Sequence, residues 1–127
     1  TLVGDAADNQ LTGLEGTDTL TGGSGNDTFI YEAADDSGIG AGNRDVITDF
    51  DAGGAGPPVD TINIFGLVGS FTFSTSGFTG GGDASAIFDD TSKVLQVDTD
   101  GTGAANMEIE LQNVSAGDLD DNDFVVG

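Results

Sequence analysis

Large apolar residues recur at a nine-residue spacing through the first third of the chain. Leu2, Leu11, Leu20 and Phe29 are nine residues apart, and Ile47 occupies a later position of the same register. Threonine and isoleucine flank these positions, a composition that favours short β-strands. A fixed period with one inward-facing apolar residue per copy predicts short parallel strands that turns stack into a β-roll.

Glycine and aspartate fill the segments between these apolar positions. Residues 22–30 read GGSGNDTFI and match every fixed position of the nonapeptide GGxGxDxux, in which u is a large apolar residue. Residues 13–21, GLEGTDTLT, lose only the second glycine. Residues 4–12, GDAADNQLT, are more degenerate and carry Asn9 where the aspartate belongs. The repeat therefore weakens toward the start of the sequence.

The acids of the repeat continue at the same spacing after the glycines have ended. Asp18, Asp27, Asp36 and Asp45 are nine residues apart. The copy at 31–39 has glycine in its apolar position, so we expect a loop there that keeps the acid without the strand. Because two copies complete one coil, we expect Asp18 to lie over Asp36 and Asp27 over Asp45. Stacked carboxylates repel each other unless a cation lies between them, so a cation is expected to be part of the fold.

The chemistry of these turns favours calcium. Glycine permits positive φ angles that let backbone carbonyls converge, and aspartate adds hard carboxylate oxygens at the same point. We therefore expect several calcium ions as cofactors. The candidate ligands are the side chains of Asp18, Asp27, Asp36, Asp45 and Asn9, with the backbone at Gly13, Gly16, Gly22, Gly23 and Gly25.

Composition excludes many other functions. The chain has 127 residues, 23 acidic and 2 basic side chains, a net charge of −21, and neither cysteine nor histidine. Zinc sites, thiol nucleophiles and Ser-His-Asp triads are therefore impossible, and we expect no enzyme in this segment. Two basic residues, Arg44 and Lys93, cannot neutralise a nucleic acid or an anionic membrane surface. No run reaches the roughly 18 apolar residues of a membrane helix, so membrane insertion is not expected either.

The second half of the sequence follows the two-residue alternation of ordinary strands from Val59 onward. Residues 86–88 and 94–97 are joined by the turn-rich connection DDTSK, and Met107–Leu111 alternates apolar residues with glutamates. We expect antiparallel strands here, and a short turn over residues 115–121 capped by its serine.

The fold class predicted from these patterns is all-β, a short parallel β-roll followed by an antiparallel β cap. Residues 1–50 are expected to form the roll with its acidic run-out loop, and residues 51–127 the cap, as one continuous domain. The cap is expected to cover the open end of the roll, because an exposed sheet end invites edge pairing.

The run DTDGTG at 98–103 superficially matches the start of an EF-hand loop. Thr102 occupies the fifth loop position, however, and Ile109 stands where the bidentate glutamate belongs. We therefore interpret this run as a hairpin turn.

At the residues quoted above, the sequence resembles the RTX family of hemolysin-type calcium-binding proteins, and more narrowly the C-terminal domain of serralysin-type secreted metalloproteases. The resemblance runs from GGSGNDTFIY through RDVITDFDAGG and VDTINI to the ending DNDFVVG. It implies that the acids after the last repeat, Asp36 and Asp45, also ligate calcium, and that the ending belongs to a type I secretion signal. The insertion GGAGPP at 53–58 departs from the family by lengthening one link.

The resemblance implies a non-catalytic, calcium-binding C-terminal module that folds outside a bacterial cell and carries the type I secretion signal of a larger exported protein. Its partners would be the type I secretion apparatus and an upstream domain of the same polypeptide. The start at Thr1 rather than methionine leads us to expect a piece of a longer protein. The alternative is a module that binds a polysaccharide or another surface, for which Tyr31 is the one obvious aromatic candidate.

Overall fold

The structure of the protein is a computed structural model that describes residues 1–53 and 59–126. It is all-β, as predicted. The GGAGPP insertion lies, apart from Gly53, outside the described residues. None of the helices within these two ranges is long and apolar enough to cross a lipid bilayer.

The secondary structure consists of short strands and single-turn helices. The strands are β1 (Leu2–Val3), β2 (Gln10–Thr12), β3 (Thr19–Thr21), β4 (Thr28–Ile30), β5 (Asp45–Ile47), β6 (Thr61–Asn63), β7 (Phe71–Phe73), β8 (Ala84–Asp89), β9 (Val94–Asp98), β10 (Met107–Leu111) and β11 (Phe124–Val125). The short 3₁₀ helices are η1 (Ala34–Asp36), η2 (Ala116–Asp118) and η3 (Asp121–Asp123).

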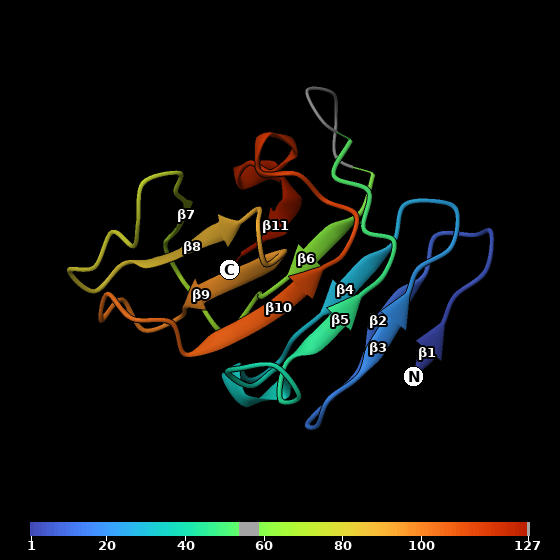
Figure 1. Cartoon of the computed structure of the whole chain (residues 1–127), viewed down its shortest axis with the longest axis horizontal. Helices are drawn as coiled ribbons and strands as arrows, with labels where there is room; N and C mark the ends of the chain where they lie inside the picture. The colour runs from blue at the N-terminus through green and yellow to red at the C-terminus, as the bar shows by residue number, and fades with distance from the viewer. Residues whose placement is uncertain (54–58, 127) are drawn as a thin grey trace.

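The first strands form a parallel roll with alternate copies on opposite sides (Figure 1). β1 pairs with β3 and places Leu2 beside Leu20, while β2 pairs with β4 and places Leu11 beside Phe29. In both strand pairs, the partners lie 18 residues apart, which is two copies of the repeat. The nine-residue period therefore predicted both the strands and their register, because only this register turns every apolar position inward.

The roll continues through β5 and β6 after a long loop. β5 stacks on β3, with Leu20 beside Ile47, and β6 stacks on β4, with Phe29 beside Ile62. The loop between β4 and β5 contributes η1 and a turn but no strand. Parallel pairing therefore extends to β6, beyond residue 50, where the sequence pattern had placed the end of the roll.

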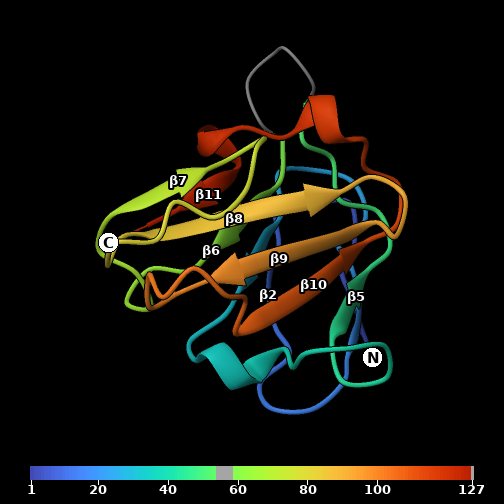
Figure 2. The same cartoon turned by 60° about the vertical axis from the view of Figure 1, so that its left-hand side comes forward.

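The second half of the molecule extends both sheets of the roll (Figure 2). β8, β9 and β10 are antiparallel neighbours, as expected. β10 also pairs in parallel with β5, which sets Ile109 beside Asp45 and Leu111 beside Ile47. β11 pairs in parallel with β6, and β7 with β8. The cap thus shares continuous sheets with the roll.

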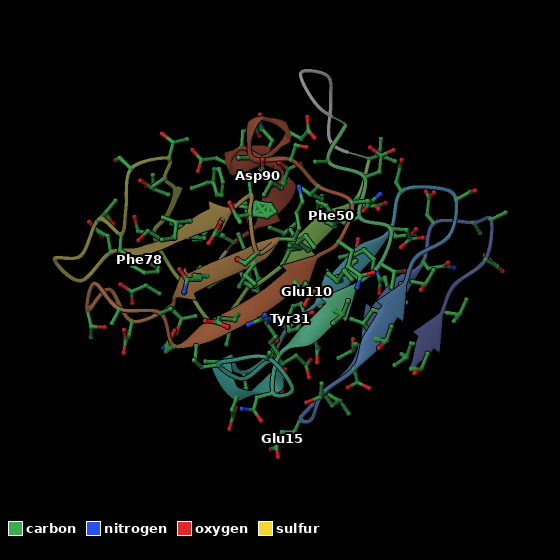
Figure 3. All side chains as sticks on the ribbon, viewed as in Figure 1. Glu15, Tyr31, Phe50, Phe78, Asp90 and Glu110 are labelled. Atoms are coloured by element: carbon green, nitrogen blue, oxygen red, sulfur yellow. The ribbon has the colours of Figure 1, made fainter. Side chains whose placement is uncertain are left out.

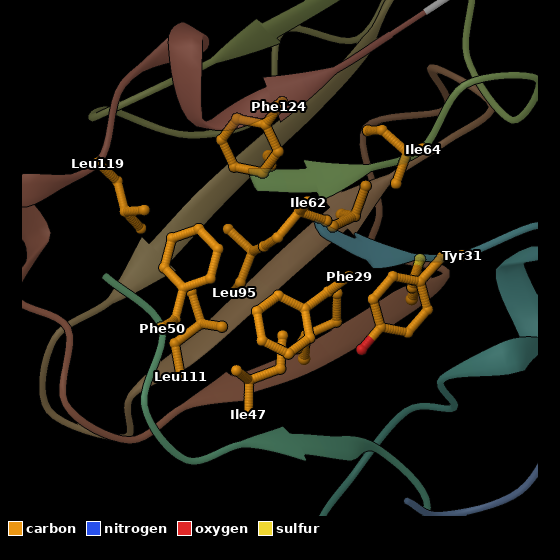
Figure 4. Packing of buried hydrophobic residues seen from close by; sticks show 14 of the residues in the cluster. Phe29, Tyr31, Ile47, Phe50, Ile62, Ile64, Leu95, Leu111, Leu119 and Phe124 are labelled. Atoms are coloured by element: carbon orange, nitrogen blue, oxygen red, sulfur yellow. The ribbon is translucent and has the colours of Figure 1, made fainter. Parts of the chain in front are cut away.

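One hydrophobic core joins the roll and the cap (Figure 4). Phe29 and Ile47 are fully buried, and the rings of Phe29 and Phe50 lie 6.0 Å apart at a tilt of 48°. Leu95 and Ile109 enter the same cluster from the cap. Burial of apolar side chains from both halves couples their folding.

The C-terminal segment packs against the edge of the sheets. The ring of Phe124 lies 4.8 Å from that of Phe71 and 5.8 Å from that of Phe73. The expected turn is present as η2 and Ser115 is its N-cap residue, but the Ser115 hydroxyl makes no capping hydrogen bond, and the Asp118 carboxylate accepts the N–H of Ser115 at 3.2 Å. Instead the backbone carbonyl of Ser115 accepts from the N–H of Asp118, because a single 3₁₀ turn is closed by its own backbone.

The buried carboxyl of Asp123 predicts a pH-dependent stability. Burial raises the pKa of Asp123 to about 6, and the charges of Asp120 and Asp118 add to that rise. A carboxyl whose pKa is higher in the folded than in the unfolded protein destabilises the fold as pH rises from about 4 through 6. Asp123→Asn should therefore raise the free energy of unfolding at neutral pH, on the order of 1 kcal/mol, with no gain near pH 4. Urea unfolding in saturating calcium at both pH values checks this, and an equal gain at both would contradict it.

Candidate metal centre

Two stacks of turns bring the acidic positions of the repeat together. In one, the N–H of Asp18 donates to Asp45 Oδ1 at 2.7 Å. In the other, the N–H of Asn9 donates to Asp27 Oδ1 and the N–H of Asp27 donates to Asp60 Oδ1, both at 2.8 Å. We call the first pair stack A and the other three residues stack B. In both stacks, the Oδ1 atom of an aspartate accepts the backbone N–H at the equivalent position of the preceding turn.

The expected stacking of Asp18 over Asp36 and of Asp27 over Asp45 is wrong. The segment between β4 and β5 forms no strand, so the next turn on the side of Asp18 is the one that ends at Asp45, 27 residues later. The next turn on the side of Asp27 ends at Asp60. Asp36 is buried but closes its own loop: its Oδ2 accepts the N–H groups of the two residues after Tyr31, at 2.8 and 3.0 Å.

Stack A contains two carboxylates that converge beside a glycine. A Cβ added to Gly13 would lie 2.9 Å from Asp18 Oδ2 and 3.2 Å from Asp45 Oδ2. Asp45 Oδ2 is buried and makes no hydrogen bond of normal geometry, and the Tyr31 hydroxyl near it is likewise buried without a partner. A buried carboxylate oxygen without a partner is costly, and a hard cation is the ligand that such oxygens favour. The residues of stack A therefore fit calcium.

The electrostatics of stack A lead to the same conclusion. Burial, together with the neighbouring charges of Asp18 and Asp36, raises the pKa of Asp45 to about 6. Burial and the neighbouring Asp45 charge also raise the pKa of Tyr31 well above its ordinary value. A positive ion between the carboxylates would lower the free energy of their charged forms.

Stack B presents a carboxylate, an amide oxygen and a backbone carbonyl. A Cβ added to Gly4 would clash with both Asn9 Oδ1 and the carbonyl oxygen of Gly22, so these two oxygens face the same space. Asp27 Oδ2 is buried without a hydrogen-bond partner and lies beside Gly22, where an added Cβ would clash with it. Stack B therefore also fits a hard cation. It offers one fewer negative charge because the neutral Asn9 side chain takes the place of an aspartate.

The remaining glycines of the repeat set the shape of the turns. Gly16, Gly23 and Gly25 have φ angles of 130°, 103° and 111°. A Cβ on Gly23 would clash with the carbonyl oxygen of Asp5, so close stacking also requires glycine there. Leu14 occupies the lost second-glycine position and still has a φ of 64°. The weaker copy thus keeps the turn geometry at the cost of backbone strain.

Comparison with known protein families identifies the module. The family model described as peptidase M10 serralysin C terminal matches residues 3–126. The chain belongs to this family. Among solved structures it is similar to the AlgE6R2 subunit from the Azotobacter vinelandii mannuronan C5-epimerase, at 22% sequence identity and a TM-score of 0.46, over 98% of this chain and 91% of that chain. No curated protein matches it significantly.

Two acids of this serralysin C-terminal module were missed by the sequence analysis. Asp60 completes stack B, and the tripeptide Asp-Thr-apolar at 60–62 repeats the one at 18–20, which would have located it. Asp49 lies outside the nine-residue period, within the RDVITDFDAGG stretch that carries the family resemblance, but the sequence analysis assigned it no role. Asp60 Oδ2 accepts the N–H of Asp51 at 2.9 Å, and both oxygens of Asp49 accept glycine N–H groups. These two carboxylates therefore act as structural acceptors.

No three acidic side chains gather around one point anywhere in residues 1–53 and 59–126. A cation in either stack would therefore combine one or two carboxylates with backbone carbonyls, as a glycine-rich turn allows. The run at 98–103 is the hairpin turn that we expected: Asp98 accepts the N–H of Gly103 at 2.6 Å, between the antiparallel strands β9 and β10.

Proposed function

We propose that this protein is a calcium-binding RTX module whose folding depends on calcium. The observation that carries the proposal is the buried, unpartnered Oδ2 of Asp45, which faces Asp18 Oδ2 beside Gly13. Asp18 and Asp45 would hold calcium in stack A. In stack B, Asp27, Asn9 and the carbonyl of Gly22 would do so. Calcium supplies the positive charge that these oxygens lack, and its binding free energy adds to the free energy of folding.

The net charge and the family support a role in export. With a charge of −21, the polypeptide repels itself when calcium is scarce, as it is in a cytosol, and an unfolded polypeptide suits passage through a type I secretion channel. Calcium outside the bacterial cell would then fold the module. In this proposal the C-terminal segment carries the secretion signal, and an upstream domain of a larger exported protein carries any catalytic activity. The family match supports this placement.

The alternative of polysaccharide binding loses its aromatic candidate. Tyr31 is 1% exposed and belongs to the buried core, so it offers no stacking surface to a sugar. Acidic side chains lie on both the roll and the cap, as Glu15 and Glu110 illustrate (Figure 3), and the net charge of −21 disfavours anionic glycans. No observation on the described residues favours this second function.

Calcium titration of chelator-stripped protein tests the proposal. Calorimetry should detect binding of several ions, and far-ultraviolet circular dichroism should show strand signal appearing with them, in a fixed salt background. Terbium gives a local readout of stack A, because Tyr31 is the only tyrosine, the sequence has no tryptophan, and the ring lies beside Asp45. Terbium luminescence excited through Tyr31 should appear on binding and disappear on addition of excess calcium. Stripped protein that is already folded and takes up no ion would refute the proposal.

A further inference from the structure

The central turn of stack B is held by the Asp49 carboxylate, which is not one of the three residues of stack B but lies in the segment that ends at Asp60. Asp49 Oδ1 accepts the N–H of Gly22 and Asp49 Oδ2 accepts the N–H of Gly23, both at 2.8 Å. Two successive backbone N–H groups that converge on one anion form a stable arrangement. Asp49 lies two residues beyond β5, so this contact reaches stack B from the segment that follows a strand of stack A.

The two hydrogen bonds fix the direction of backbone carbonyls. The N–H and C=O of a trans peptide unit point in opposite directions. The N–H of Gly23 shares its peptide unit with the C=O of Gly22, so binding of that N–H by Asp49 turns the Gly22 carbonyl away from Asp49 and toward Asn9 Oδ1. The preceding unit follows the same rule: the N–H of Gly22 binds Asp49, and the C=O of Thr21 accepts the N–H of Gly4 at 2.8 Å.

We propose that Asp49 is a positioning residue for the stack B cation site. Each of its oxygens accepts one backbone N–H, so its assigned role is to orient the turn and not to ligate the cation. It aims the Gly22 carbonyl into the space that Asn9 Oδ1 also faces, and it makes the stack B site depend on the segment after β5. This inference rests on the proposed function, since it concerns a cation site of the same roll.

Two variants of Asp49 and one control separate this role from a general effect of charge. Asp49→Ala removes both acceptors, and Asp49→Asn keeps one oxygen. Asp51→Asn is the matched control, because it removes the same charge two residues away, where, among residues 1–53 and 59–126, the Asp51 side chain accepts a single N–H, that of Gly53 in its own loop. Each variant is studied in the whole chain of 127 residues, by calcium calorimetry for all sites and by Tyr31-sensitised terbium luminescence for stack A.

We expect Asp49→Ala to lose one class of calcium sites, or to weaken it by about 10- to 100-fold, the range typical of residues that orient ligands. The terbium midpoint at stack A should shift less than the affinity of the weakened class, because only the folding equilibrium couples the two stacks. Asp49→Asn should fall between wild type and Asp49→Ala, and Asp51→Asn should match wild type. If Asp49→Ala fails to fold, Asp49→Asn decides alone, by a calorimetric loss at one class of sites that is larger than the shift of its terbium midpoint.

If both Asp49 variants bind calcium with the wild-type affinities and number of sites, the positioning role is overturned. An equal loss at both stacks would also overturn it, because a merely structural residue would weaken every site together. Failure of the proposed function is distinguishable from both outcomes, since wild-type protein would then bind no calcium and give no terbium signal.

Discussion

Asp45→Asn should stabilise the metal-free protein and weaken calcium binding at the same time. Without a cation, the buried Asp45 carboxylate lies beside the Asp18 carboxylate, and its pKa is raised to about 6. An amide removes that charge and still offers an oxygen to the N–H of Asp18, which Asp45 Oδ1 accepts at 2.7 Å. At neutral pH the metal-free variant should therefore gain stability on the order of 1 kcal/mol. Its affinity for calcium should fall at least about tenfold, because a charged ligand is lost.

The strand signal in far-ultraviolet circular dichroism in chelator reports the first effect, and calorimetry of calcium binding, with thermal unfolding in saturating calcium, reports the second. Most of the gain in chelator should disappear near pH 4, because Asp45 is then protonated in the folded protein and about half protonated in the unfolded one. Glu15→Gln is the control, since it removes one charge from an exposed position of the same turn as Asp18. A change of the same sign in both forms, or an equal change in the control, would contradict the expectation.

The nine-residue period predicted the part of the fold that depends on local sequence. Each copy carries its own turn and one inward residue, so the pairing of Leu2 with Leu20 and of Leu11 with Phe29 follows from counting alone. The glycine turns follow as well, because φ angles above zero favour glycine over other residues. The local sequence of each copy therefore determines the all-β roll and which of its residues face the core.

The period could not predict which acids stack. Stacking depends on which copies form strands, and the segment between β4 and β5 keeps its acid, Asp36, while its backbone leaves the roll. That excursion is stabilised by distant contacts. The Ser37 hydroxyl donates to the backbone carbonyl of Glu108 and accepts the N–H of Asp45, and the Arg44 guanidinium binds the Glu108 carboxylate at 2.8 Å. No periodicity encodes a contact across more than 60 residues.

The same limit applies to the cap. Alternation predicted that Met107–Leu111 is a strand with its apolar residues inward, and Met107, Ile109 and Leu111 are fully buried. It could not predict that this strand pairs in parallel with β5, because alternation fixes the faces of a strand and not its neighbours. The sheet that joins roll and cap arises from these non-local pairings.

Phe29→Ala should cost about 3–5 kcal/mol of the free energy of unfolding in saturating calcium. Phe29 is fully buried in β4, the central partner of β2 and β6, and its ring packs against Phe50. Truncation removes this contact and leaves a cavity between two sheets that are held apart by their other side chains. Phe65→Ala is the matched control, because Phe65 is 65% exposed and its truncation should change the free energy by less than about 0.5 kcal/mol.

The loss at Phe29 should reappear as weaker calcium binding, although this side chain is no ligand. If calcium binds only the folded roll, each 1.4 kcal/mol of lost folding free energy lowers the apparent affinity about tenfold once the metal-free protein is largely unfolded. Urea unfolding in saturating calcium gives the first quantity, and calcium titration of stripped protein gives the second. A large loss of stability with an unchanged affinity would mean that the stacks bind calcium without the core, and that binding and folding of this module are separate events.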